Sequence, residues 1–204
     1  MIMDNENGRE TDHSTELARF FSEAGMLKRT KRTGYAVHGS GQADTVAEHS
    51  YRAMLMGYII ALQEGADTTK VLKMLLFHDL PETRLGDLHK IAAKYVDKDS
   101  AEKQIAQEQA HLLPDALGQE FLVLLDEFNT ALTLEAKCAK DADKLELAFQ
   151  AKEFADTGNP QLLDIVERTG TVLKTKTAQR LYAAMLSSRA PWWAGLKKPV
   201  EESY

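Results

Sequence analysis

Apolar positions recur at helical spacing along most of the chain, and no segment alternates convincingly between apolar and polar residues as a strand would. A first helix is predicted over residues 14–27, with Ser14 as its N-cap and Gly25 as its stop. Later helices are predicted over 98–113, 115–129, 131–156, 160–168 and 171–188. The predicted fold class is therefore all-α.

The helix that follows residue 45 carries a clear start signal. Thr45 and Glu48 match a capping box, in which each side chain accepts a hydrogen bond from the other residue's backbone N–H. The helix runs to about Gln63, and Gly65 ends it. It is apolar nearly all round after Ala53, which predicts a buried central helix.

The next helix ends at a histidine–aspartate pair. Asp67 or Thr68 caps its start, and an apolar run leads to His78-Asp79. Pro81 cannot continue the helix without loss of a hydrogen bond, so the pair is expected in the last turn.

Two segments do not follow a long helical pattern. Residues 28–43 are basic at the start and glycine-rich at the end, and Tyr35 and Val37 among clustered arginines favour an ordered loop. A solvated surface loop is the alternative. Residues 82–96 contain Gly86 and are expected to form short helical stretches.

Composition suits one folded domain. The chain has 204 residues, of which 44% are hydrophobic, enough for a core. Residues 1–13 are predicted to be a flexible N-terminus and residues 14–190 the domain. Residues 191–204 are predicted to be a C-terminal tail, with Trp192-Trp193 packing against the fold or a second copy.

Charge and cysteine content narrow the possible partners and the compartment. The 25 Lys and Arg residues against 31 Asp and Glu residues leave a net charge of -6, which disfavours nucleic-acid polymers and anionic membranes. A single cysteine, Cys138, fits a reducing compartment. The polar N-terminus has no apolar signal segment, and no apolar run is long enough to span a bilayer. A cytoplasmic protein without a membrane partner is predicted.

Four residues on helical segments suggest a metal site: His49, His78, Asp79 and Asp143. Two imidazoles and two carboxylates make a mixed nitrogen–oxygen site that leaves coordination positions open for water and substrate, as a catalytic metal requires. Taken singly, a helical histidine is more often structural. The combination favours a metal-dependent hydrolase.

The same segments carry a family resemblance. A-E-H-S-Y-R, H-D-L-P-E-T-R-L-G-D-L and A-K-D-A-D-K-L-E resemble the HD-domain superfamily of metal-dependent phosphohydrolases, and within it the 5'-deoxynucleotidases. The resemblance covers residues 15–185 and implies an HD-domain multi-helix bundle with a buried metal site. It further implies a phosphomonoesterase that converts (deoxy)nucleoside 5'-monophosphates to nucleoside and phosphate, and a homodimer.

The resemblance assigns the metal ligands. His49, His78, Asp79 and Asp143 are implied to bind one divalent metal ion per chain, which could be Mn²⁺, Co²⁺, Fe²⁺ or Zn²⁺. Asp143 is preferred over Asp141 because the family pattern places the ligand directly before a segment such as K-L-E.

The resemblance also implies catalytic and substrate-binding residues. Glu82 and Asp87 match its two acids, which would act as general base and acid or orient the attacking water. Arg32 matches the arginine expected to hold the phosphate, with Arg29 as a competitor. Tyr35 is the expected substrate-pocket residue, at a place where the closest bacterial members have a tryptophan that helps exclude a ribose 2'-hydroxyl. The sugar preference therefore stays open.

Three other functions remain open from the sequence. The basic cluster at residues 28–32 could serve a nucleoside triphosphate or an alarmone. A di-iron oxygenase would need a second metal, but His89 and His111 fall in no second motif, so a mononuclear site is favoured. A helical scaffold that keeps the metal for stability would not need Glu82, Asp87 and an arginine as well.

Overall fold

The structure is a computed structural model that describes residues 12–188. The predictions for the flexible N-terminus and for the tail with Trp192-Trp193 therefore fall largely or wholly outside the described residues. Within residues 12–188 the chain forms helices and no strand, apart from one isolated antiparallel bridge between Lys31 and Thr45. The all-α fold class is confirmed.

The described helices follow in chain order along the sequence. They are α1 (Ser14–Ala24), η1 (Gly25–Lys28), α2 (Gly34–Val37), α3 (Val46–Glu64), α4 (Thr68–Phe77), α5 (Glu82–Leu85), η2 (Ala92–Lys94), α6 (Lys98–Ala110), α7 (Asp115–Thr130), α8 (Leu134–Asp156), η3 (Pro160–Leu162), α9 (Leu163–Gly170) and α10 (Lys176–Ser187).

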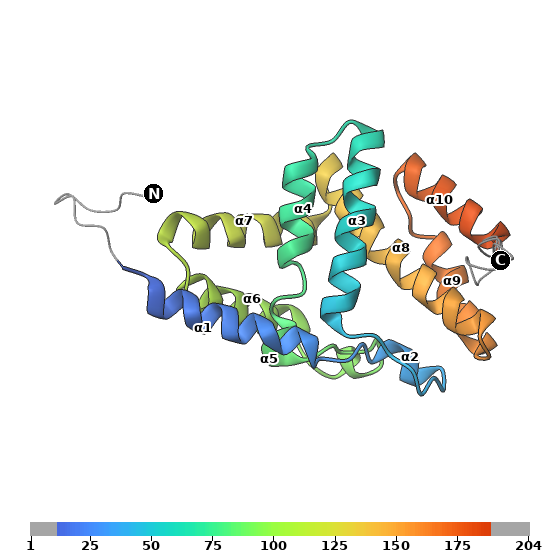
Figure 1. The fold of residues 1–204 in the computed structure, drawn as a ribbon, viewed down its shortest axis with the longest axis horizontal. Helices are drawn as coiled ribbons and strands as arrows, with labels where there is room; N and C mark the ends of the chain where they lie inside the picture. Colours follow the sequence, from blue (N-terminus) through green and yellow to red (C-terminus); the bar gives the residue numbers. More distant parts are fainter. Residues whose placement is uncertain (1–11, 189–204) are drawn as a thin grey trace, which may run out of the picture.

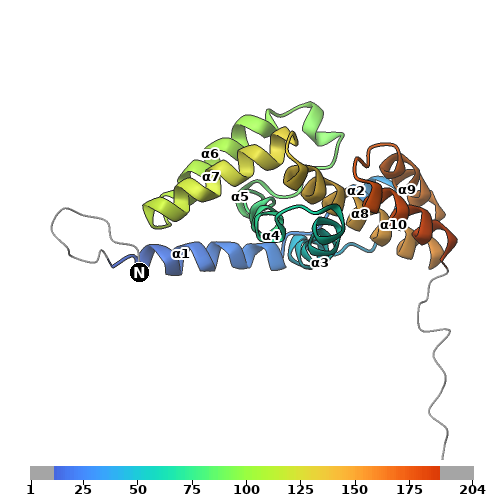
Figure 2. The ribbon, with the colours of Figure 1, turned by 90° about the horizontal axis from the view of Figure 1, so that it is seen from above.

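Helices α3, α4 and α8 form the centre of the bundle. Helices α3 and α4 lie side by side, and α8 crosses behind them and contacts both (Figure 1). Helices α1, α6 and α7 extend to one side of this centre, and α9 and α10 lie on the other (Figure 2). The largest apolar core joins α3, α4 and α8 through residues such as Ile60, Met74, Leu75 and Leu145. This core is the support on which the candidate site is built.

The predicted caps of the two central helices are confirmed. Thr45 and Glu48 form the capping box, with the Thr45 backbone N–H donating to the Glu48 carboxylate at 2.6 Å. Gly65 ends α3 in the left-handed conformation, at φ 73°. Asp67 caps α4 by accepting hydrogen bonds from the N–H groups of the next turn.

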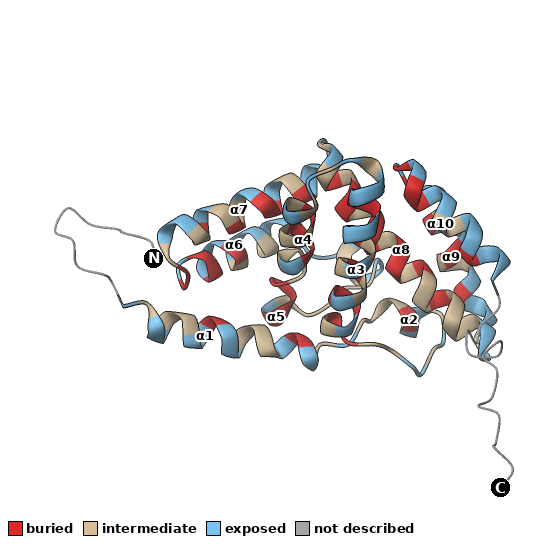
Figure 3. Cartoon of the chain, turned by 45° about the horizontal axis from the view of Figure 1, so that its top comes forward, coloured by how far each residue is buried: buried red, intermediate tan, exposed pale blue. Residues whose placement is uncertain are grey.

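Helix α3 is central but not buried all round, so that prediction was wrong in part. One face packs so closely on α4 that a side chain at Gly57 would collide with Leu75. The opposite face leaves Tyr51, Leu55 and Leu62 more than half exposed (Figure 3). A single copy of the chain has no element among the described residues to cover that face.

Some helix starts differ from the prediction. Ser14 is the first helical residue of α1 rather than its cap, and the Asp12 carboxylate accepts its N–H at 2.9 Å. Helix α10 begins at Lys176 instead of residue 171, because Thr175 caps it after a turn. No helix among residues 12–188 is both long and apolar enough to cross a membrane.

Candidate metal centre

The His78-Asp79 pair lies where α4 ends. Phe77 is the last helical residue of α4, His78 is its C-cap, and Pro81 is the N-cap of the short helix α5. The Nδ1 atom of His78 lies 2.8 Å from the carbonyl oxygen of Leu75, which can only accept a hydrogen bond. That bond places a proton on Nδ1 and leaves the Nε2 lone pair free to bind a cation.

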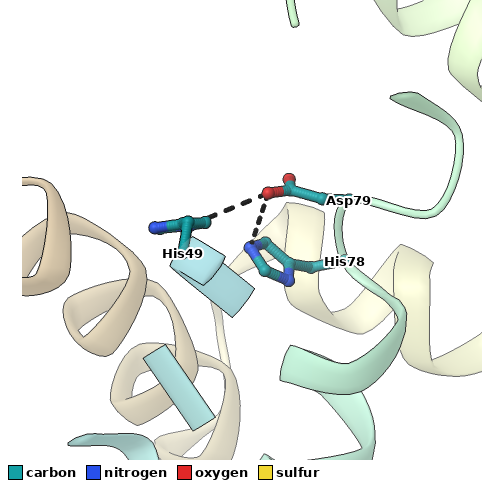
Figure 4. Close-up of side chains that lie close together, drawn as sticks. All are labelled: His49, His78 and Asp79. Carbon is teal, nitrogen blue, oxygen red and sulfur yellow. Dashed lines mark ion pairs between the residues drawn. The ribbon is translucent and has the colours of Figure 1, made fainter. Parts of the chain in front are cut away.

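His49, from the first turns of α3, faces this pair and the long helix α8. Its Nε2 lies 3.7 Å from Oδ2 of Asp79 and 3.3 Å from Oδ1 of Asp143. Nε2 of His78 lies 3.1 Å from the same Oδ2 of Asp79. Figure 4 shows the two imidazoles pointing toward the Asp79 carboxylate. The structure thus brings together the four predicted ligands from three segments of the chain.

The arrangement fits a metal ion. Possible ligand atoms of His49, His78 and Asp79 all lie within 4.8 Å of one another. The Nε2 atoms of both histidines are buried and have no hydrogen-bond partner among the described residues. Since buried polar atoms are rarely left unpaired, these two nitrogens and their facing carboxylates are a donor set suited to a divalent cation.

The surrounding charges shift the pKa values of these groups. Burial and Arg32 oppose protonation of His49, but the carboxylates of Asp143 and Glu146 outweigh them and raise its pKa to about 9. Burial alone would raise the pKa of Asp79, yet His78 and His49 hold it well below its usual range. Burial opposes the charge of Asp143 as well, but Lys144 and His49 hold its pKa well below the usual range. Both carboxylates at the centre are therefore charged, as metal binding requires.

Glu146 is a residue of the centre that the sequence reasoning missed. Its carboxylate hydrogen-bonds Nδ1 of His49, and Nε of Arg52 donates to its other oxygen at 2.9 Å. Arg52 is held in turn by Glu153, at 2.9 Å and 3.0 Å. The available signal was spacing, because Glu146 follows Asp143 by three residues on one helix and so shares its face.

Glu82 lies one helical turn beyond Asp79, in the first turn of α5. It is 5% exposed, and its nearest cationic neighbour is Lys98, whose Nζ lies 3.7 Å from Oε1. Burial, together with the charges of Asp79 and Asp87, raises the pKa of Glu82 to about 9. A carboxyl group so placed can hold a proton at neutral pH beside the metal ligands.

Asp87 connects the α5 turn to the loop before α3. Its Oδ2 accepts hydrogen bonds from the backbone N–H and the hydroxyl of Thr33. The Thr33 hydroxyl also lies 3.0 Å from the Asp87 carbonyl oxygen. These hydrogen bonds of Asp87 therefore fix the position of Thr33, which follows Arg32 in the chain.

Arg32 and Tyr35 lie on the inner side of that loop. The backbone N–H of Arg32 donates to the carbonyl of Asp44 at 3.0 Å, and the pKa of its guanidinium stays raised despite burial, because Tyr35 and the carboxylates of Asp79 and Asp143 lie nearby. Tyr35 is fully buried, its ring packs edge-on to Phe154, and its hydroxyl has no hydrogen-bond partner among residues 12–188.

Three other candidates lie elsewhere. Both carboxylate oxygens of Asp141 accept hydrogen bonds from backbone N–H groups just before α10, so this carboxylate stabilises the turn that leads into α10. His89 accepts the N–H of Ala92 at 3.2 Å, and His111 is the C-cap of α6. Neither histidine joins a possible metal cluster within the described part of the chain.

A family model described as HD domain matches residues 24–182. The chain belongs to the HD domain family. Two curated relatives carry the name 5'-deoxynucleotidase HDDC2: one from Dictyostelium discoideum is 35% identical over 66% of this chain and 75% of its own. The other, from Homo sapiens, is 31% identical over 69% of each chain.

Solved structures share the fold of this chain. A conserved hypothetical protein from Pyrococcus furiosus matches with a TM-score of 0.70 and 30% identity, over 83% of this chain and 98% of that one. A predicted metal-dependent phosphohydrolase from Magnetospirillum magnetotacticum matches with a TM-score of 0.65 and 22% identity, over 84% of this chain and 92% of that one. The multi-helix HD-domain bundle is thereby confirmed.

Proposed function

We propose that this HD-domain protein is a divalent-metal-dependent phosphohydrolase that converts (deoxy)nucleoside 5'-monophosphates to nucleoside and phosphate. His49, His78, Asp79 and Asp143 hold the metal. The observation that carries the proposal is the pair of buried Nε2 atoms of His49 and His78, which face the two carboxylates and have no hydrogen-bond partner among residues 12–188. Relatives named 5'-deoxynucleotidase support the choice of reaction and substrate.

A bound divalent cation supplies charge neutralisation for the phosphate and a bound water with a lowered pKa. Side chains of the protein position the substrate. Arg32 binds non-bridging phosphate oxygens through its planar guanidinium, which makes no hydrogen bond of its own to another side chain within residues 12–188. Tyr35 remains a predicted substrate-pocket residue, and its buried hydroxyl near Arg32 supports that assignment.

Glu82 and Asp87 complete the proposed machinery. Glu82 holds a proton beside the metal ligands and donates it to the leaving 5'-oxygen, a step that typically contributes about 10²–10⁴-fold in rate. Asp87 orients the attacking water with its other carboxylate oxygen, while Oδ2 stays bound to Thr33. The first step therefore needs Glu82 protonated.

The centre is proposed to hold one metal ion per chain. Its mixed histidine and carboxylate ligands fit Mn²⁺, Co²⁺, Fe²⁺ or Zn²⁺. The only other group of possible ligands among the described residues is Asp44, His49 and Glu146, and it shares His49. Because the two groups share His49, the described residues do not offer separate ligand sets for two metal ions, which argues against a di-iron oxygenase. A triphosphate or alarmone substrate is the alternative within the hydrolases.

We further propose that the protein is cytoplasmic and forms a homodimer. The exposed apolar face of α3, which includes Tyr51, Leu55 and Leu62, supports association with a second copy. Sedimentation velocity of the purified protein tests this directly. A monomer at micromolar concentration contradicts the dimer.

Phosphate release from a panel of ribo- and deoxynucleoside 5'-monophosphates tests the function. The protein is stripped of metal and reconstituted separately with Mn²⁺, Co²⁺, Zn²⁺ and Mg²⁺. Metal-dependent turnover that is lost in Asp79→Ala and Glu82→Ala, but kept in the exposed control Asp164→Ala, is the expected result. Absence of turnover in a protein that binds one metal ion per chain overturns the nucleotidase proposal.

A further inference from the structure

A partly enclosed cavity of about 190 Å³ opens between α6 and α7, next to the metal centre. These two helices lie side by side along one flank of the bundle (Figure 2). His78 and Pro81 are among the residues that line the cavity. The cavity and the metal centre therefore share one residue, His78.

The lining of this cavity suits a flat heteroaromatic ring. Ala106, Leu122 and Leu125 provide apolar walls. Gln107 and Asn129 are exposed lining residues and therefore lie at the mouth, and their amides can both donate and accept hydrogen bonds. The lining also includes three charged residues: Glu102, Lys103 and Asp126. Apolar walls with a few polar groups are typical of small-molecule sites, and amide side chains are suited to pair with the edge of a nucleobase.

A chain of charged residues links the cavity to the proposed proton donor. Lys98 Nζ lies 3.1 Å from Oε1 of Glu102, which lines the cavity, and 3.7 Å from Oε1 of Glu82. His78 lines the cavity and also belongs to the metal centre, so the two sites adjoin at this residue. The cavity volume, below the roughly 300–1,000 Å³ of pockets for drug-sized ligands, fits one ring system better than a whole nucleotide.

A second hollow does not compete for this role. It has a volume of about 620 Å³, lies along α1, and is lined by residues such as Ser14, Arg19 and Ser22. It is far more open, and it shares no residue with the metal centre. Because this hollow has no residue in common with the metal centre, it does not adjoin the place where the phosphate of a nucleotide would bind.

We infer that the cavity between α6 and α7 is the base subsite, which receives the heteroaromatic base of the nucleotide whose phosphate lies at the metal centre. This inference rests on the proposed function. The apolar walls cover the two faces of the ring, and Gln107 and Asn129 hydrogen-bond its edge at the mouth. Base recognition is then separate from the binding of the phosphate by Arg32 and the metal.

Activity on two substrates distinguishes recognition of the base from recognition of the rest of the nucleotide. A deoxynucleoside 5'-monophosphate carries the base, and 2-deoxyribose 5-phosphate lacks it. Gln107→Trp and Asn129→Trp place bulk at the mouth of the cavity, and Gln119→Trp is the matched control on an exposed part of α7 away from it. Thermal melting of each variant establishes that it folds.

The expected result is a selective loss. Both mouth variants lose about tenfold or more in kcat/KM for the nucleotide, as is typical when a fitted pocket contact is removed, and keep the activity on the sugar phosphate. Gln119→Trp matches the unsubstituted protein on both substrates. Equal losses on both substrates, or no loss on either, overturn the base subsite.

Binding of nucleosides to the metal-free protein tests the subsite without turnover. Calorimetry with deoxyadenosine and with thymidine is expected to detect binding that Asn129→Trp weakens and Gln119→Trp does not. If the protein hydrolyses no monophosphate, the proposed function fails, and this binding experiment still decides on the subsite. Equal nucleoside affinity in all variants overturns the inference.

Discussion

The carboxylate of Glu146 hydrogen-bonds Nδ1 of His49 and thereby leaves Nε2 of that ring facing Asp79 and Asp143. Arg52 holds the same carboxylate from its other side, at 2.8 Å. Such partners orient a ligating imidazole and raise its basicity, and their loss typically weakens metal binding about 10–100-fold. Glu146 is thus a positioning residue for the metal centre.

Glu146→Gln is expected to lower divalent-metal affinity by about 10–100-fold, because the neutral amide no longer stabilises the ring with its charge. The measurement is a competition titration against a chelator of known affinity. Glu153→Gln is the control, since Glu153 also pairs with Arg52 but has a side chain that is 44% exposed, and it is Glu146 that contacts His49. Equal affinity in Glu146→Gln and the unsubstituted protein contradicts the prediction.

Metal affinity is expected to rise with pH below 9. His49 has a pKa raised to about 9 in the metal-free protein, so at neutral pH its Nε2 proton must leave when a metal binds. Release of one proton makes the apparent affinity rise about tenfold per pH unit in this range. Calorimetry in buffers of different ionisation enthalpy counts the released protons, and an affinity independent of pH between 6.5 and 8.5 contradicts the assignment.

Glu82→Gln is expected to abolish turnover and to stabilise the metal-free protein at alkaline pH. The pKa of Glu82 is about 9 in the folded chain against its ordinary 4.5. The folded state thus binds a proton that the unfolded state lacks between those values, and stability falls as pH rises through that window. The glutamine variant escapes this loss.

Thermal melting of both metal-free proteins at pH 5 and pH 8 measures the effect of that substitution. The midpoint of Glu82→Gln should exceed that of the unsubstituted protein by about 2–8 °C at pH 8, and the difference should shrink at pH 5. A variant that melts lower at both pH values shows that Glu82 stabilises the fold in its charged form. In that case Glu82 would not be the proton donor.

Arg32→Lys is expected to lower kcat/KM for a 5'-monophosphate by about 10–100-fold while metal affinity stays unchanged. Lysine keeps the positive charge but cannot reproduce the planar pair of donors that guanidinium offers to phosphate oxygens. Steady-state kinetics and metal titration on the same preparation check both parts. Arg29→Lys serves as the control, because Arg29 was the competing candidate in the sequence; a loss there instead would reassign the phosphate contact.

The sequence by itself determined the helical class, the capping box of Thr45 and Glu48, and the break at Pro81, and it narrowed the cap of α4 to Asp67 or Thr68. Helical spacing, capping side chains and proline act over a few neighbouring residues, so they can be read locally. The motifs around His49, His78 and Asp143 likewise indicated the family and the type of metal site. The apolar composition of α3 was visible too, but not the face that remains uncovered.

Only the tertiary structure decided which distant groups meet. Glu146 reaches His49 because α8 crosses α3, and Asp87 reaches Thr33 because the turn after α5 folds back onto the loop before α3. The cavity between α6 and α7 likewise depends on how those helices pack beside His78. Packing of side chains far apart in the chain sets such contacts, and the local pattern of residues does not encode them separately.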